Sequence, residues 1–163
     1  MTKLTGCDTL LIDEEFLEIA KYLVGSAEHS ICIATFKAEI TPRPRGRKLL
    51  ELFELMFEKS RVGVNIRFIL DGYGRKPSSP QSNIHAANVI SNHNIKMRSL
   101  PNSRCCHAKM ILVDNSAAII GSHNLSVKSC SSNFEISYLI TDNDKITQLQ
   151  DLFNHLWKDS LKR

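Results

Sequence analysis

The sequence lacks the cysteine pattern of a disulfide-bonded or zinc-binding domain. Its 163 residues contain five cysteines, an odd number, and no Cys-x-x-Cys pair. Disulfide frameworks use even numbers of cysteines at recurring spacings, and structural zinc sites use closely spaced pairs. We therefore expect reduced thiols, no metal site and a cytoplasmic protein. Cys105 and Cys106 are adjacent rather than spaced for chelation, and we interpret them as buried or incidental thiols.

Long apolar runs are also missing. No segment approaches the roughly 20 apolar residues that a transmembrane helix needs. Residues 1–18 contain no apolar stretch of the kind found in signal peptides. We expect no transmembrane segment and no signal peptide, which again favours the cytoplasm. The net charge of +4 and the pI of about 8.8 permit a polyanionic partner without requiring one.

The sequence does contain an alternation of helical and strand-like patterns. Apolar residues at helical spacing predict helices over 10–27, 48–61, 83–92 and 144–161. Short β-branched runs predict strands over 30–36, 64–70, 95–100 and 134–141, with loops over 41–48 and 71–82. This order predicts an α/β fold, a mixed β-sheet sandwiched by helices, in a single domain spanning 1–163.

The most informative stretch runs from 107 to 124 and reads HAKMILVDNSAAIIGSHN. Two β-prone apolar runs flank a polar break at 114–116. This arrangement is typical of a β-hairpin, in which short polar residues form the turn. We therefore predict a hairpin that folds near Asn115.

Polar side chains stand at both ends of this predicted hairpin. Alternate residues on a strand share a face, so His107 and Lys109 should point the same way. Counting the register from the turn brings Ser122 and Asn124 back beside His107. A nucleophile or base, a cation and two small polar groups then converge. This combination suits an anionic substrate, and phosphate is the first candidate.

The same stretch resembles the HKD motif of the phospholipase D superfamily. The residues that carry the resemblance are His107, Lys109, Asp114, Gly121, Ser122 and Asn124. Glu135 falls where that family places its downstream acidic residue, and the predicted element order resembles the family's half-domain across nearly the whole chain. Most members carry two such motifs, whereas this sequence has one. It therefore resembles the small single-motif branch, which includes homodimeric endonucleases and other phosphodiesterases.

The resemblance implies a role for each polar residue of the motif. His107 would attack phosphorus and form a covalent phosphohistidine. Lys109 would clamp the phosphate oxygens and offset the charge that develops in the transition state. Ser122 and Asn124 would donate hydrogen bonds. Glu135, which should face away from its apolar neighbours, would hold the ring nitrogen of His107 as an acid orients the base in other triads.

Three further residues of the stretch receive structural interpretations. Asp114 lies seven residues from His107, which on an extended strand is roughly 23 Å. Because it cannot orient His107 within its own strand, we assign it to the turn. Gly121 is likewise assigned a structural role in the motif. His123 should point away from its two polar neighbours, which favours a structural or rim position.

Cationic side chains in the two predicted loops can track a nucleic-acid backbone. These residues are Arg43, Arg45, Arg47, Lys48, Arg75 and Lys76. Aromatic residues for base stacking are sparse there, with Tyr73 as the obvious candidate. The alternative is that these cations are only solvated surface, as charged loops commonly are.

Taken together, the resemblance implies a phosphodiesterase, and most plainly a nuclease, that needs no metal or cofactor. One histidine cannot attack phosphorus and protonate the leaving oxygen on the far side, so the reaction requires a homodimer that shares its site. Two alternatives stay open: a phospholipid phosphodiesterase and a non-catalytic dimeric nucleic-acid-binding module. The sequence shows no exposed apolar helix for a membrane, and its intact motif speaks against a non-catalytic role.

Overall fold

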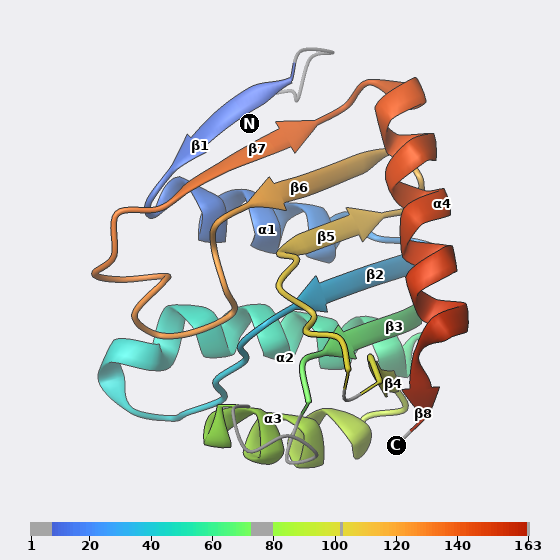
Figure 1. Ribbon diagram of the computed structural model, residues 1–163. Coiled ribbons are helices and arrows are strands. Elements are labelled where there is room, and N and C mark those ends of the chain that lie inside the picture. The colour runs from blue at the N-terminus through green and yellow to red at the C-terminus, as the bar shows by residue number, and fades with distance from the viewer. Residues whose placement is uncertain (1–7, 73–79, 102, 163) are drawn as a thin grey trace.

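The computed structural model describes residues 8–72, 80–101 and 103–162. Its strands form one mixed sheet (Figure 1). The strands are β1 (Thr9–Ile12), β2 (Ser30–Thr35), β3 (Asn65–Leu70), β4 (Lys96–Ser99), β5 (Met110–Val113), β6 (Ala117–Gly121), β7 (Ile136–Ile140) and β8 (Leu161–Lys162). Their order in the sheet is β1-β7-β6-β5-β2-β3-β4-β8. The pairs β2–β3 and β3–β4 are parallel, and the remaining pairs are antiparallel.

Helices cover both faces of the sheet, as the predicted fold class requires. They are α1 (Glu15–Ser26), α2 (Arg47–Arg61), α3 (Gln81–Ser91) and α4 (Asn143–Asp159), with a short 3₁₀ helix, η1 (Pro44–Gly46). Helices α1, α2 and α3 share the larger core with one face, where Phe53 and Phe68 are fully buried. Helix α4 covers the other face, with Phe153 in a smaller core. The predicted α/β fold with helices on both sides is confirmed.

Helix α2 shows why its sequence folds this way. Its buried residues recur at intervals of three and four, so they form one apolar stripe against the sheet: Leu49, Leu52, Phe53, Met56 and Phe57. Within the described ranges, no helix combines the length and the apolar character needed to cross a bilayer.

Some predicted boundaries were wrong. The helix predicted over 10–27 begins at Glu15, because Thr9–Ile12 pairs with β7 as an edge strand. The helix predicted over 144–161 ends at Asp159, and Leu161–Lys162 pairs with β4. Both errors involve short apolar runs, which fit a strand or a helical turn equally well without their pairing partners.

The predicted loops were also only partly correct. The loop over 41–48 contains η1 and the first residues of α2. Helix α3 begins at Gln81, inside the loop predicted over 71–82, and residues 73–79 of that loop lie outside the described residues.

The predicted hairpin is confirmed. Strands β5 and β6 are antiparallel, with Met110 opposite Ile120. Asp114 and Asn115 both have φ of 51°. Two consecutive left-handed residues form the type of turn whose twist matches that of paired strands, and Asp and Asn tolerate this conformation best after glycine.

A carboxylate anchors the turn to the next strand of the sheet. The Asp114 carboxylate accepts backbone N–H groups from Glu28 at 2.6 Å, His29 at 2.9 Å and Ser30 at 2.6 Å. Burial alone would raise the pKa of Asp114, but these three donors lower it below its ordinary value. The hairpin is thereby fixed to the start of β2.

Replacing Asp114 with Ala should destabilise the fold by roughly 2 kcal/mol, because three backbone donors lose a charged acceptor. The folded-state pKa is depressed, so this stabilisation is complete above the ordinary Asp pKa of about 3.9 and is lost as the pH falls through the folded-state value. Urea unfolding at neutral pH and near pH 3 should show the gap between wild type and Asp114→Ala shrinking on acidification. A stability difference between wild type and Asp114→Ala that does not change with pH would contradict this account.

Candidate functional site

His107 and Lys109 lie just before β5, in the interior of the strand order, and their side chains touch. The Lys109 Nζ atom is 3.1 Å from Nδ1 and 3.3 Å from Nε2 of His107, and it donates to the His107 carbonyl oxygen at 2.7 Å. Regular pairing begins only at Met110, so the pair precedes the strand rather than standing on it. Burial lowers the pKa of Lys109. A partly desolvated ammonium of this kind interacts strongly with an anion.

A buried polar network, which the sequence analysis missed, holds the chain around His107. The Phe36 ring lies against the imidazole, with centroids 5.1 Å apart. Asp71 Oδ1 accepts the backbone N–H of Cys106 at 2.8 Å, one residue before His107. Asn83, which is fully buried, donates to the carbonyl oxygens of Phe36 and Asp71 and accepts a further backbone N–H at 3.0 Å. The ends of β2 and β3 are thereby tied to the segment that contains His107.

The segment that follows β6 is organised by a second cluster. Ser122 Oγ donates to Oε2 of Glu135. Ser129 Oγ and Asn133 Nδ2 each donate to Oε1 of Glu135 at 2.9 Å. Ser129 Oγ also accepts the backbone N–H of Asn124 at 2.9 Å. One carboxylate and one buried hydroxyl thus fix the whole returning segment, and Ser129 is a residue that the sequence analysis did not single out.

The predicted contact between Glu135 and His107 was wrong within this chain. Among the described residues, the Glu135 carboxylate accepts from Ser122, Ser129 and Asn133 instead. Burial alone would raise the pKa of Glu135, but these donors lower it, so the group stays ionised. Its three side-chain donors all come from the segment that follows β6.

Asn124 connects the returning segment to the end of β2. Its Oδ1 atom accepts the backbone N–H of Lys37 at 3.1 Å. No residue in the described part of the chain accepts from its Nδ2 group, so this amide is a donor available to a ligand. The predicted donor role therefore has a suitable group, which lies beside a second lysine.

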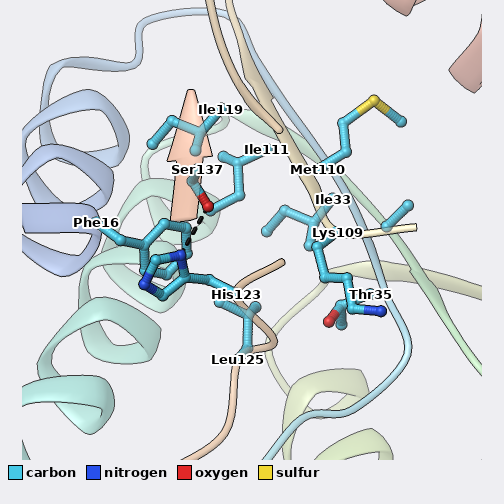
Figure 2. A pocket seen from close by; sticks show the side chains of 11 residues that line it. Phe16, Ile33, Thr35, Lys109, Met110, Ile111, Ile119, His123, Leu125 and Ser137 are labelled. Carbon is cyan, nitrogen blue, oxygen red and sulfur yellow. Dashed lines mark hydrogen bonds between the residues drawn. The ribbon is translucent and has the colours of Figure 1, made fainter. Parts of the chain in front are cut away.

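His123 points into the core (Figure 2), so it takes the structural position rather than the rim position, the two that were predicted. Its ring stacks on Phe16, with centroids 4.3 Å apart and an interplanar angle of 8°. Nδ1 lies 2.7 Å from Ser137 Oγ, and Nε2 lies 3.0 Å from the Asp13 carbonyl oxygen. Burial lowers the pKa of His123, which keeps it neutral. The adjoining cavity of about 10 Å³ holds at most one water, so it is no substrate site.

Gly121 allows two strands to approach closely beside the site. Its N–H donates to the Lys109 carbonyl oxygen at 3.2 Å. A Cβ atom at this position would collide with Ser137 and with the carbonyl oxygen of Ile136 on β7. Only glycine therefore fits between the segment of Lys109 and β7.

The predicted basic cluster divides into separate parts. Arg43 and Arg45 line a pocket of about 420 Å³ next to α3. Arg75 and Lys76 lie outside the described residues.

The other two basic residues of this cluster lie outside that pocket's lining and face acidic side chains. Arg47, whose side chain is 83% exposed, has its Nε atom 4.0 Å from Glu51. Lys48 forms an ion pair with Glu14 at 2.9 Å. Their charge is therefore partly compensated within the chain.

Comparisons with known proteins identify the family of the chain. A family model described as "Cardiolipin synthase, PLD-like domain" matches residues 21–157. The DISARM protein DrmC of Bacillus paralicheniformis is 32% identical over 113 residues, which are 68% of this chain and 45% of that protein. The chain thus spans less than half the length of this curated relative.

Solved structures show the same fold. Nuc from Salmonella typhimurium, a phospholipase D family member, matches with a TM-score of 0.78 at 18% identity. NucT from Helicobacter pylori matches with a TM-score of 0.75 at 16% identity. Each match covers 96% of this chain and 99% of the other.

Replacing the buried Ser129 with Ala should destabilise the protein by about 1–3 kcal/mol, because Glu135 loses a donor and the Asn124 N–H loses its acceptor. Ser131→Ala is the matched control, since that exposed hydroxyl donates only to the Val127 carbonyl oxygen. It should leave stability nearly unchanged in the same urea titration. Equal losses in the two variants would argue against the Ser129 cluster.

Proposed function

The chain belongs to the phospholipase D superfamily, and from that premise we propose that it is a metal-independent phosphodiesterase that cleaves nucleic acid. The observation that carries the proposal is the contact between the side chains of Lys109 and His107. A ring nitrogen that carries no proton can attack phosphorus while the ammonium binds the phosphate oxygens. Within the described residues of the motif, His107 and Lys109 are the pair in which a nucleophile contacts a cation.

The proposed reaction has two displacement steps. A His107 nitrogen bonds to phosphorus as the bond from phosphorus to the leaving oxygen breaks, and that oxygen takes a proton from His107 of a second copy. Water then gives a proton to the second histidine, and its oxygen displaces the first histidine from phosphorus. The products are a phosphomonoester and an alcohol, and both imidazoles return to their starting states.

An apolar groove supports the proposal that a second copy of the chain completes the site. The groove, of about 520 Å³, is lined by residues of β1, β6, β7 and α4, and by Lys109. Leu10, Ile136, Tyr138 and Leu152 line it with between 41% and 50% of their surfaces exposed. Large exposed apolar surfaces mark interfaces. A two-fold contact through this groove would bring both copies of Lys109 to one shared site.

The charge and apolar surface favour nucleic acid over phospholipid as the substrate. Arg43 and Arg45 are exposed beside the site, and the chain carries a net charge of +4. Cations of this kind bind a phosphate backbone. The exposed apolar side chains of the groove would be covered by the second copy, which leaves less surface to contact a membrane.

His107→Ala should lower the cleavage of DNA, RNA and bis(p-nitrophenyl) phosphate by at least about 10³-fold, because the nucleophile is lost. His155→Ala, which removes an exposed histidine on α4, is the matched control and should retain activity. Quenching with a labelled phosphodiester should leave acid-labile label on the wild type and none on His107→Ala. Unchanged cleavage by His107→Ala would refute the proposal, and complete loss of wild-type activity in EDTA would refute metal independence.

Tyr138→Asp should convert the dimer to a monomer and reduce activity in parallel, because it places a charge in the apolar groove. Tyr22→Asp is the matched control, since Tyr22 is 52% exposed on α1, outside the groove. Sedimentation equilibrium should give twice the chain mass of 18.4 kDa for the wild type and the control. A fully active wild-type monomer would contradict the shared site.

A further inference from the structure

The pocket of about 420 Å³ beside the site has no part in the two displacement steps. Its walls come from the loop before α2, the first turns of α3 and the segment that follows β6 (Figure 1). Its volume falls within the range of about 300–1,000 Å³ that small-molecule sites occupy. The residues that matter for its chemistry are Arg43, Arg45, His85, Lys128, Ile40 and Val127.

Hydrogen bonds join this pocket to the proposed catalytic site. Asn124 Oδ1 accepts the Lys37 N–H at 3.1 Å. The Glu39 N–H donates to the Leu125 carbonyl oxygen at 2.8 Å, and the Val127 N–H donates to Glu39 Oε2 at 2.7 Å. The two segments therefore run side by side from the site to the pocket. Asn124 and Val127 are three residues apart, which is at most about 11 Å of extended chain.

Among the described residues that line the pocket, three are cationic, Arg43, Arg45 and Lys128, and one is a carboxylate, Glu39. Burial alone would raise the pKa of Glu39, but hydrogen bonds from Lys37 and the backbone lower it, so its carboxylate is ionised and already engaged. Across the described ranges, no carboxylate forms an ion pair with Arg43, Arg45 or Lys128. These three cations are available to an anionic ligand.

We propose that the pocket binds one nucleotide of a single-stranded nucleic acid, close in the strand to the phosphodiester that is cleaved. Ile40 and Val127 offer a base an apolar surface, and the guanidinium groups of Arg43 and Arg45 can stack on the base or pair with its phosphate. Ser82 Oγ lines the pocket and has no hydrogen-bond partner in the described part of the chain. A base enters only when it is unpaired and unstacked, so a duplex is excluded. This inference rests on the proposed function.

A phospholipid headgroup carries the same phosphate but brings acyl chains that need an apolar surface. One exposed isoleucine, Ile84, adjoins the pocket on α3. The larger set of exposed apolar side chains lies on β1, β7 and α4 instead, at Leu10, Ile12, Ile136, Tyr138 and Leu152. Nucleic acid is therefore the ligand that fits the pocket's surroundings.

Binding measurements in the His107→Ala background test this pocket without cleavage. The probes are a short fluorescein-labelled single-stranded oligonucleotide, the same sequence as a duplex, and phosphatidylglycerol vesicles. Arg43→Ala/Arg45→Ala should weaken single-strand binding about tenfold or more and should reduce the salt slope by about 0.7 for each phosphate that the protein no longer neutralises. Arg47→Ala/Lys48→Ala likewise removes two positive charges, both outside the pocket lining, and should change binding less than about twofold.

Val127→Trp fills the pocket without altering charge, and it should also weaken single-strand binding while leaving duplex binding unchanged. Equal losses in Arg43→Ala/Arg45→Ala and Arg47→Ala/Lys48→Ala, or a loss confined to vesicles, would overturn the pocket assignment. Hydrolysis of bis(p-nitrophenyl) phosphate by the wild type reports on the proposed function alone, because this substrate has no neighbouring nucleotide. Absence of this hydrolysis would reject the proposed enzyme activity. The binding measurements on the variants decide separately whether the pocket binds a nucleotide.

Discussion

The register of β5 against β6 is the constraint on which the rest of the site depends. Side chains alternate along a strand, so a slip of one residue would turn Lys109 and the returning polar groups to opposite faces. The left-handed turn at Asp114 and Asn115 fixes the pairing, and the Asp114 carboxylate fixes the turn to β2. Lys109 then lies across from Gly121, where the lack of a side chain lets β7 approach. Local turn chemistry and one long-range carboxylate together determine which groups meet.

Around this hairpin, buried polar side chains hold loops that would otherwise be free to move. Asn83 and Asp71 connect the ends of β2 and β3 to the segment of His107. Ser129 and Glu135 do the same for the segment that follows β6. An unsatisfied buried polar group costs about 1–3 kcal/mol, so each connection restricts the loops to one arrangement. Ligand sites commonly lie at strand ends in such sheets, and here the polar residues explain how irregular loops provide a rigid setting.

The sequence was sufficient to predict what depends on local spacing. The hairpin and the layered α/β architecture follow from periods of two and 3.6 residues and from turn chemistry. What it did not predict depends on pairing between distant segments. The partners of Glu135 are serine and asparagine side chains that the loop brings together. Lys48 forms an ion pair with Glu14, a residue of another segment. Edge strand β1 was missed because four residues show their conformation only beside β7.

Asp13 and Glu135 exchange hydrogen bonds across 122 positions of the chain. The Asp13 carboxylate accepts the Glu135 N–H at 2.8 Å, and the Glu135 carbonyl oxygen accepts the Asp13 N–H at 3.1 Å. Asp13 is synthesised 122 residues before Glu135. A growing chain therefore carries its histidine and lysine before the carboxylate that orders the neighbouring segment can be held in place. The order of synthesis itself postpones completion of the site until Glu135 and its neighbours have been synthesised.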